Sequence, residues 1–111
     1  MLFTYELARR LQGTGVTANC VHPGVVRDTA LGRGERFPVP VRVAWALLRP
    51  FMKSPDQGAS TSVYAATSPD LEGVSGKFFS NSREARTSKA SYDQALAERL
   101  WTVSAQLVGV A

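Results

Sequence analysis

The sequence has few of the residues that build metal centres or covalent cross-links. Cys20 is the only cysteine and His22 the only histidine among 111 residues. One cysteine cannot form an internal disulfide, and within an apolar stretch it is expected to act as a small buried hydrophobe rather than a reactive thiol. Because no second histidine or carboxylate cluster accompanies His22, we favour a hydrogen-bonded side chain over a metal ligand or a catalytic base. We therefore expect no metal site.

Long apolar runs and a concentrated basic surface are missing too. The longest apolar run, Val43–Leu48, is far too short to cross a membrane, so we expect no membrane span in this chain. The net charge is +4, but the basic residues are scattered and are not interleaved with aromatic ones, which argues against nucleic-acid binding. A lone thiol is compatible with a reducing compartment, and we expect a cytoplasmic location.

What remains is the pattern of an ordinary globular α/β chain. The apolar share is 44% and the charged share 20%, and the length allows one domain at most. Periodicity predicts helices over residues 1–12, 41–49, 54–67 and 92–107, and strands over residues 16–22 and 77–80. Such alternation predicts a parallel sheet with helices on its faces. Two strands would leave an edge unpaired and a face uncovered, which indicates a missing partner, either more chain or another subunit.

Each helix also carries a predicted packing face. The first is expected to pack through Phe3, Leu7 and Leu11, with an ion pair between Glu6 and Arg10 on its outer side. Capping patterns begin at Ser54 and Ser91. The remaining predicted faces consist of small residues in the third helix and of large apolar residues in the last: Ala59, Ser62, Val63 and Ala66, then Leu96, Leu100, Val103 and Leu107.

The chain is organised around the stretch GVTANCVHPGVVRDT, residues 15–29. A strand without charged residues stops abruptly at Pro23-Gly24, and ligands of open parallel sheets bind just past the carboxyl ends of the strands. Pro23 fixes the exit direction of the chain, and Gly24 lets a flat ligand approach the backbone. On local grounds alone an ordinary turn after a strand is the simpler interpretation.

A second apolar stretch follows this turn. Val41, Ala44, Trp45, Leu48 and Met52 form a wide apolar surface. Core packing and a wall over an apolar substrate remain equal alternatives, because apolar pockets and cores share composition.

These stretches carry a likeness to a known family. The segments LFTYELARRLQGTGVTANCVHPGVV, GASTSVYAATSPDLEGVSGKFFS and AERLWTVSAQLVG, in this order, resemble the C-terminal part of a short-chain dehydrogenase/reductase, in particular of the retinol-dehydrogenase-like branch. The resemblance implies that residues 1–111 are a single partial domain, the last two strands and flanking helices of a doubly wound parallel Rossmann sheet. It also implies NAD or NADP as cofactor and an apolar alcohol or ketone as substrate.

The resemblance assigns roles to particular positions. Pro23, Gly24, Val25 and Val26 would line the nicotinamide pocket, and Thr29 stands one position later than the threonine of the family, with Asp28 in its place. Residues 30–53 correspond to the variable substrate-binding segment. Its predicted substrate contacts are Trp45, Leu48 and Met52.

Two parts of the family's machinery do not occur in this sequence. There is no glycine-rich phosphate loop, and no tyrosine is followed four positions later by lysine: Tyr5, Tyr64 and Tyr92 precede Arg9, Ser68 and Leu96. The first helix also lacks an N-cap, as if its natural start lay upstream of Met1. We therefore expect a fragment of a hydride-transferring enzyme that is inactive alone. The alternative is a non-catalytic interaction module that completes its sheet by self-association into a homo-oligomer.

Overall fold

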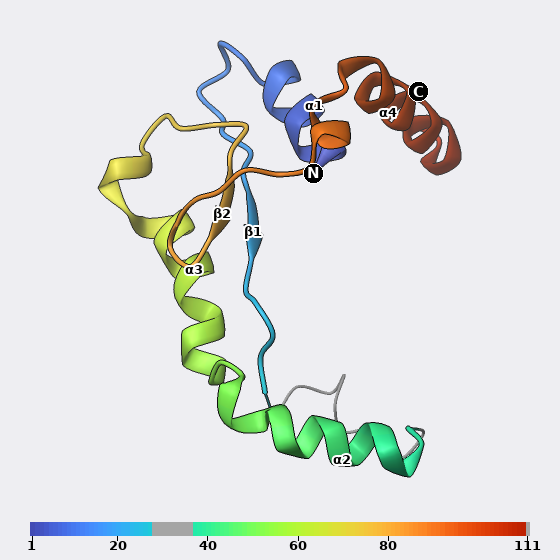
Figure 1. The fold of residues 1–111 in the computed structure, drawn as a ribbon. Helices are drawn as coiled ribbons and strands as arrows, with labels where there is room; N and C mark the ends of the chain where they lie inside the picture. The colour runs from blue at the N-terminus through green and yellow to red at the C-terminus, as the bar shows by residue number, and fades with distance from the viewer. Residues whose placement is uncertain (28–36, 111) are drawn as a thin grey trace.

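The computed structural model describes residues 1–27 and 37–110. One helix runs along the short central sheet. Two helices lie against each other at one end of the molecule, and another helix lies at the opposite end (Figure 1). The helices are α1 (Leu2–Arg10), α2 (Val39–Leu48), α3 (Pro55–Thr67) and α4 (Gln94–Val108), with 3-10 turns η2 (Arg49–Phe51), η3 (Pro69–Leu71) and η4 (Lys89–Tyr92). The strands are β1 (Cys20–His22), β2 (Phe78–Ser80) and β3 (Arg83–Glu84).

The sheet has three strands in the order β1-β2-β3. β1 and β2 are parallel, with Val21 opposite Phe79, and β2 and β3 are antiparallel. The fold is therefore α/β, as predicted, with a parallel strand pair and flanking helices that are consistent with part of a Rossmann-like fold. The sheet is mixed rather than wholly parallel, and β1 is shorter than the strand predicted over residues 16–22.

The third strand corrects the prediction of strands over residues 16–22 and 77–80 alone. Asn81 and Ser82 have φ values of 53° and 55°, and two successive residues with positive φ form the tight turn that best suits a hairpin. The turn returns the chain beside β2, where Glu84 also accepts a hydrogen bond of 2.8 Å from Nζ of Lys77. The strand was missed because it is only two residues long and both are charged.

Helix α3 covers one face of the sheet. Its start is the predicted capping box: the Ser54 side chain accepts from the Gln57 N–H, and the Gln57 side chain accepts from the Ser54 N–H. Phe79, 2% exposed, meets the ring of Tyr64 edge to face at 6.1 Å. The predicted packing face is wrong, however. Gly58 and Thr61 are buried, whereas the four residues predicted to pack are exposed: Ala59, Ser62, Val63 and Ala66.

Helices α1 and α4 stack against each other through aromatic side chains. The Phe3 and Trp101 rings lie 4.9 Å apart and nearly parallel, and the Arg10 guanidinium lies 4.6 Å from the Trp101 centroid. The predicted ion pair between Glu6 and Arg10 is present at 2.6 Å. Glu6 is nevertheless only 1% exposed, so its predicted outward position is wrong, whereas Phe3 of the predicted buried stripe is 44% exposed.

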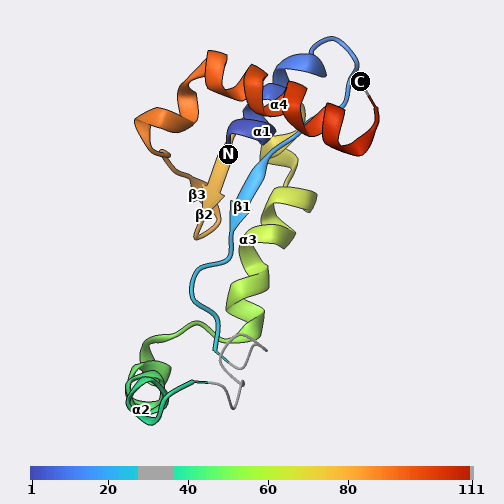
Figure 2. The same cartoon turned by 90° about the vertical axis from the view of Figure 1, so that its right-hand side faces the viewer.

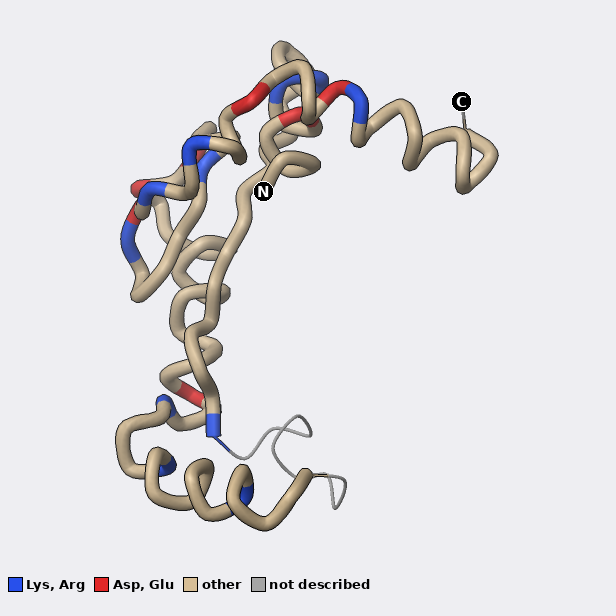
Figure 3. The backbone as a smooth tube through the Cα atoms, turned by 45° about the vertical axis from the view of Figure 1, so that its right-hand side comes forward, with Lys and Arg blue, Asp and Glu red and all other residues tan. Residues whose placement is uncertain are grey.

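The start and the packing of α4 both differ from expectation. Ser91 belongs to η4, and the cap is Asp93, whose carboxylate accepts from the Leu96 N–H at 3.0 Å. The stripe predicted to be buried is solvent-exposed, from 40% at Leu100 to 82% at Leu107, and Ala97 is the buried apolar residue of the helix. Figure 2 shows α4 along the outer side of α1, and Figure 3 shows its C-terminal half without charge.

Helix α2 buries none of its residues. Val41 and Leu48 are 44% and 54% exposed, and Phe51 in the following turn is 87% exposed. No residue of this surface is therefore fully buried in the described part of the chain: Trp45 and Met52 are half-buried, and the others are exposed. The buried apolar core is small and consists, among the described residues, of Ala8, Phe79 and Ala97.

Candidate functional site at the carboxyl end of the first strand

The Pro23-Gly24 turn follows β1 directly, at the end of the molecule where α2 lies (Figure 1). Gly24 adopts φ +83°, a left-handed conformation that favours glycine because other residues would place a Cβ against the backbone. Val25, the next residue, is 58% exposed. The turn thus presents an apolar side chain at the carboxyl end of a parallel strand.

Lys53 binds this turn through both its backbone and its side chain. Its N–H donates to the Val25 carbonyl at 3.0 Å, and its carbonyl accepts from the Arg27 N–H at 2.9 Å, so that Val26 and Lys53 form a parallel bridge. The Lys53 ammonium donates to the Pro23 carbonyl at 3.2 Å and to Asn81 Oδ1 at 2.6 Å. These contacts join the turn after β1 to the hairpin turn after β2.

Gly58 supports the turn from α3. A Cβ on Gly58 would overlap Cγ2 of Val26 and lie 3.3 Å from Cγ1. The start of α3 therefore approaches the turn closely because residue 58 has no side chain. Thr61, one turn later and fully buried, accepts a 3.1 Å hydrogen bond from the Ser82 N–H.

The geometry restricts where a flat nicotinamide ring could lie. A Cβ on Gly24 would be 3.1 Å from both Cε and Nζ of Lys53, so the lysine already covers that side of the glycine. The exposed Val25 side chain remains as an apolar surface. The Val25 carbonyl already accepts from Lys53 but, like any carbonyl, retains a second lone pair. The residues present therefore fit the nicotinamide end of a cofactor on the Val25 side of the turn.

The other predicted site residues are distributed between α2 and its flanks. Trp45 and Met52 are half-buried and Leu48 is 54% exposed. Thr29 and residues 30–36 lie outside the described part of the chain. His22 is exposed and Cys20 is half-buried, and residues 1–27 and 37–110 contain no cluster of side chains suited to a metal ion.

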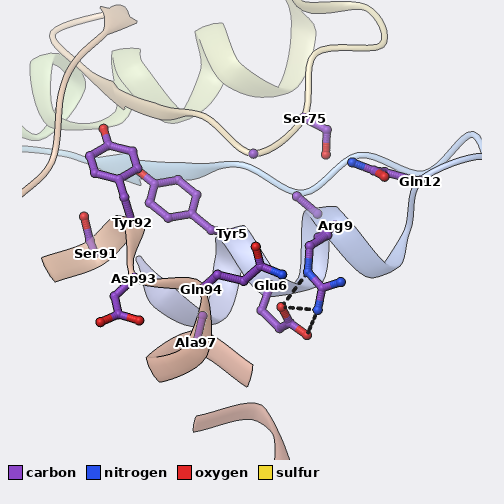
Figure 4. A pocket seen from close by; sticks show the side chains of 12 residues that line it. Tyr5, Glu6, Arg9, Gln12, Ser75, Ser91, Tyr92, Asp93, Gln94 and Ala97 are labelled. Carbon is purple, nitrogen blue, oxygen red and sulfur yellow. Dashed lines mark hydrogen bonds and ion pairs between the residues drawn. The ribbon is translucent and has the colours of Figure 1, made fainter. Parts of the chain in front are cut away.

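A separate pocket of about 330 Å³ lies between α1, the start of α4 and the loop at Ser75 and Gly76 (Figure 4). The Tyr5 and Tyr92 rings stack at 5.3 Å on one side of it. Glu6 binds both Arg9 and Arg10, and the Tyr5 hydroxyl lies 2.9 Å from Thr87 Oγ1. Most polar groups of the pocket thus have hydrogen-bond partners within the chain, many of them outside the pocket. No sequence pattern indicated it, because it is formed by residues from both ends of the chain.

Hydrogen bonding and burial shift the titration of three side chains around this pocket. Burial acts to raise the pKa of Glu6, but hydrogen bonds from Arg10 and Arg9 outweigh it and hold that pKa below its usual value. Burial raises the pKa of Tyr5, and hydrogen bonds with Thr87 lower the pKa of Tyr92. Glu6 is therefore a permanent anion at neutral pH, paired with two arginines.

Comparisons with known proteins bear on the resemblance seen in the sequence. No family model matches the chain. The chain is 47% identical to mouse retinol dehydrogenase 14 over 115 residues, which cover 99% of this chain and 33% of that protein. It is 48% identical to mouse retinol dehydrogenase 12 over 110 residues and 47% identical to mouse retinol dehydrogenase 13 over 115 residues, covering 99% and 100% of this chain and 34% of each relative.

The chain spans about a third of the length of the curated relatives that it matches. These matches fit a fragment of a protein of the short-chain dehydrogenase/reductase class. Within it, the chain corresponds to part of a retinol-dehydrogenase-like protein, which confirms the resemblance seen in the sequence. In the part that the structure describes, no helix combines the length and the hydropathy needed to cross a lipid bilayer.

Proposed function

We propose that this chain forms the nicotinamide-side turn and part of the substrate wall of an NAD- or NADP-dependent oxidoreductase. The observation that carries the proposal is the turn Pro23–Val26. It leaves the carboxyl end of a parallel strand, contains a glycine at φ +83° and exposes Val25. Ligands of open α/β sheets bind at this end of the strands. The bound cofactor would supply hydride chemistry, and Val25 and Val26 would orient its nicotinamide.

The substrate is proposed to be an apolar alcohol or ketone. Relatives that cover almost the whole chain are named retinol dehydrogenases, and retinol is a long apolar alcohol. Trp45, Leu48 and Met52 follow the turn and lie on or beside a helix without buried residues. A helix with an open apolar surface beside the proposed nicotinamide turn suits a wall over such a substrate.

The 111-residue chain alone is proposed to be inactive. Proton transfer in this family is expected from a tyrosine whose pKa is lowered by a neighbouring lysine, and the sequence contains no Tyr-x-x-x-Lys. The test is an assay of the purified chain with retinol, with NAD or NADP, and with retinal and the reduced cofactors. We expect no turnover above a blank. Steady turnover would show that the missing pair is not essential.

A non-catalytic module that self-associates is the second candidate, favoured by the exposed apolar face of α4. Size-exclusion chromatography with circular dichroism separates the two: a compact dimer supports the module, whereas a chain that does not form a defined dimer supports the fragment. Leu107→Lys adds a charge where the side chain is 82% exposed and should dissociate a dimer formed through this face. Gln106→Lys adds the same charge at the neighbouring position and serves as the control.

A further inference from the structure

We infer that Lys53 is the positioning residue of the Pro23–Val26 turn and that its ammonium binds the carboxamide oxygen of a nicotinamide placed there. The inference rests on the proposed function and adds a residue to it. Neither the motif of the strand nor the capping box of α3 points to Lys53, which sits immediately before the cap residue Ser54.

The first step concerns the contacts that Lys53 makes. Four hydrogen bonds connect it to its surroundings: two through its backbone, to Val25 and Arg27, and two through its ammonium, to Pro23 and Asn81. The side chain also fills the space beside Gly24. One residue thus fixes both the path of the turn and the surface next to its glycine.

The second step concerns the charge. A lysine ammonium has three N–H donors. Among residues 1–27 and 37–110, its acceptors are the Pro23 carbonyl and Asn81 Oδ1. One of the three donors thus has no acceptor among these residues. The carboxamide oxygen is the acceptor carried by the nicotinamide ring itself, and a hydrogen bond to an ammonium is stronger than one between neutral groups.

The third step connects the turn to the hairpin. Asn81 lies in the left-handed turn that begins β3, and the adjacent Ser82 N–H is held by the fully buried Thr61. Because Thr61 belongs to α3, the hairpin turn has a rigid support. The backbone beside Asn81 is thus held by α3, and the Asn81 side chain accepts from the Lys53 ammonium at 2.6 Å.

The experiment compares ¹⁵N-labelled wild-type chain with Lys53→Met, Lys53→Arg and Asn81→Ala, and with Lys89→Met, the last removing an exposed lysine in η4 as control. We expect Lys53→Met to shift the Gly24 and Asn81 amide resonances together, and Asn81→Ala to shift that of Gly24. Lys89→Met should move none of them. If neither Lys53→Met nor Asn81→Ala shifts the Gly24 amide resonance, the positioning role is overturned.

Binding is measured on the same samples with oxidised nicotinamide mononucleotide, and with ribose 5-phosphate as a probe without the ring. Lys53→Met should raise the Kd for the mononucleotide about tenfold, because one hydrogen bond to a charged group is lost. Lys53→Arg should restore most of the affinity. A Kd within about twofold of wild type overturns the carboxamide contact. Equal weakening for ribose 5-phosphate also overturns it, because Lys53 would then bind phosphate.

Failure of the proposed function would give a different result from failure of the Lys53 contact. If the wild-type chain binds neither probe, the cofactor site is rejected together with the carboxamide contact. The joint shifts of Gly24 and Asn81 still decide whether Lys53 positions the turn. Since Lys53→Arg and Asn81→Ala retain most of the contacts, the positioning role stays testable even if Lys53→Met does not fold.

Discussion

Val26 packs directly on Gly58, so closely that a Cβ at position 58 would overlap the valine Cγ2. Gly58 lies in the first turn of α3, and Val26 lies in the turn after β1. The contact makes the position of the proposed nicotinamide turn depend on a missing side chain in a helix. Glycine inside a helix normally costs about 0.5–1 kcal/mol relative to alanine, so its presence here indicates a packing requirement.

Gly58→Ala should therefore destabilise the chain. At an exposed helical position the same change would stabilise it by about 0.5–1 kcal/mol. Here the added methyl must displace Val26, and overpacking of this kind costs about 1–3 kcal/mol. The midpoint of urea unfolding measures the difference. Ser62→Ala, at an exposed position of the same helix, should change the free energy of unfolding by less than about 0.5 kcal/mol. A stabilised Gly58→Ala chain would show that α3 does not approach the turn as described.

Glu6 should make stability depend on pH. Its pKa is lowered in the folded chain by Arg10 and Arg9 against the effect of burial. The ionised carboxylate therefore contributes stability above its ordinary pKa of 4.5, and this contribution is lost as the pH falls through the lowered value. At pH 7, Glu6→Gln should unfold at a lower urea concentration than wild type. The difference between the two midpoints should be smaller at pH 3.

Glu98→Gln is the matched control for this prediction. Glu98 also binds Arg9, at 3.0 Å, but its side chain is 45% exposed, so the change should have little effect at either pH. A Glu6→Gln gap that is the same at pH 7 and pH 3 would contradict the assignment of a lowered pKa to a buried Glu6.

Ser82→Gly should stabilise the hairpin between β2 and β3. Ser82 has φ 55°, where a non-glycine residue is strained by about 1–2 kcal/mol. Glycine relieves this strain but costs about 0.5–1 kcal/mol in chain entropy, which leaves a gain of about 0.5 kcal/mol. Ser80→Gly within β2 carries only the entropy cost and should destabilise. Urea unfolding of both variants gives the signs, and a less stable Ser82→Gly chain would argue against the described turn.

Local features of the fold were predictable from the sequence, and contacts between distant segments were not. The capping box at Ser54 and the turn at Pro23-Gly24 each depend on a few consecutive residues. Lys53 was missed because its ammonium contacts Pro23, 30 positions away, and Asn81, 28 positions away. No spacing rule relates such residues.

The errors in packing have a similar cause. The packing face of α3 was predicted from residues whose side chains could form contacts. The observed face is centred on Gly58, which packs closely because it has no side chain. Periodicity identified the apolar stripe of α4 but could not show whether anything in this chain covers it. With Leu107 at 82% exposure, nothing among the described residues covers this end of the stripe. The expected ion pair of Glu6 is present, but it is not at the surface, because pairing with two arginines allows the carboxylate to be buried.

The most direct test of the account replaces the matching third of mouse retinol dehydrogenase 14 with this chain and measures turnover of retinol with NAD and NADP. We predict an active chimera, because the chain would supply the nicotinamide turn to a complete enzyme. Gly24→Val in that chimera should abolish turnover, since a β-branched side chain is strained at φ +83° and its Cβ would lie 3.1 Å from the Lys53 ammonium, which would have to shift. A folded chimera without turnover, or a Gly24→Val chimera as active as its parent, would contradict the proposed role of the turn.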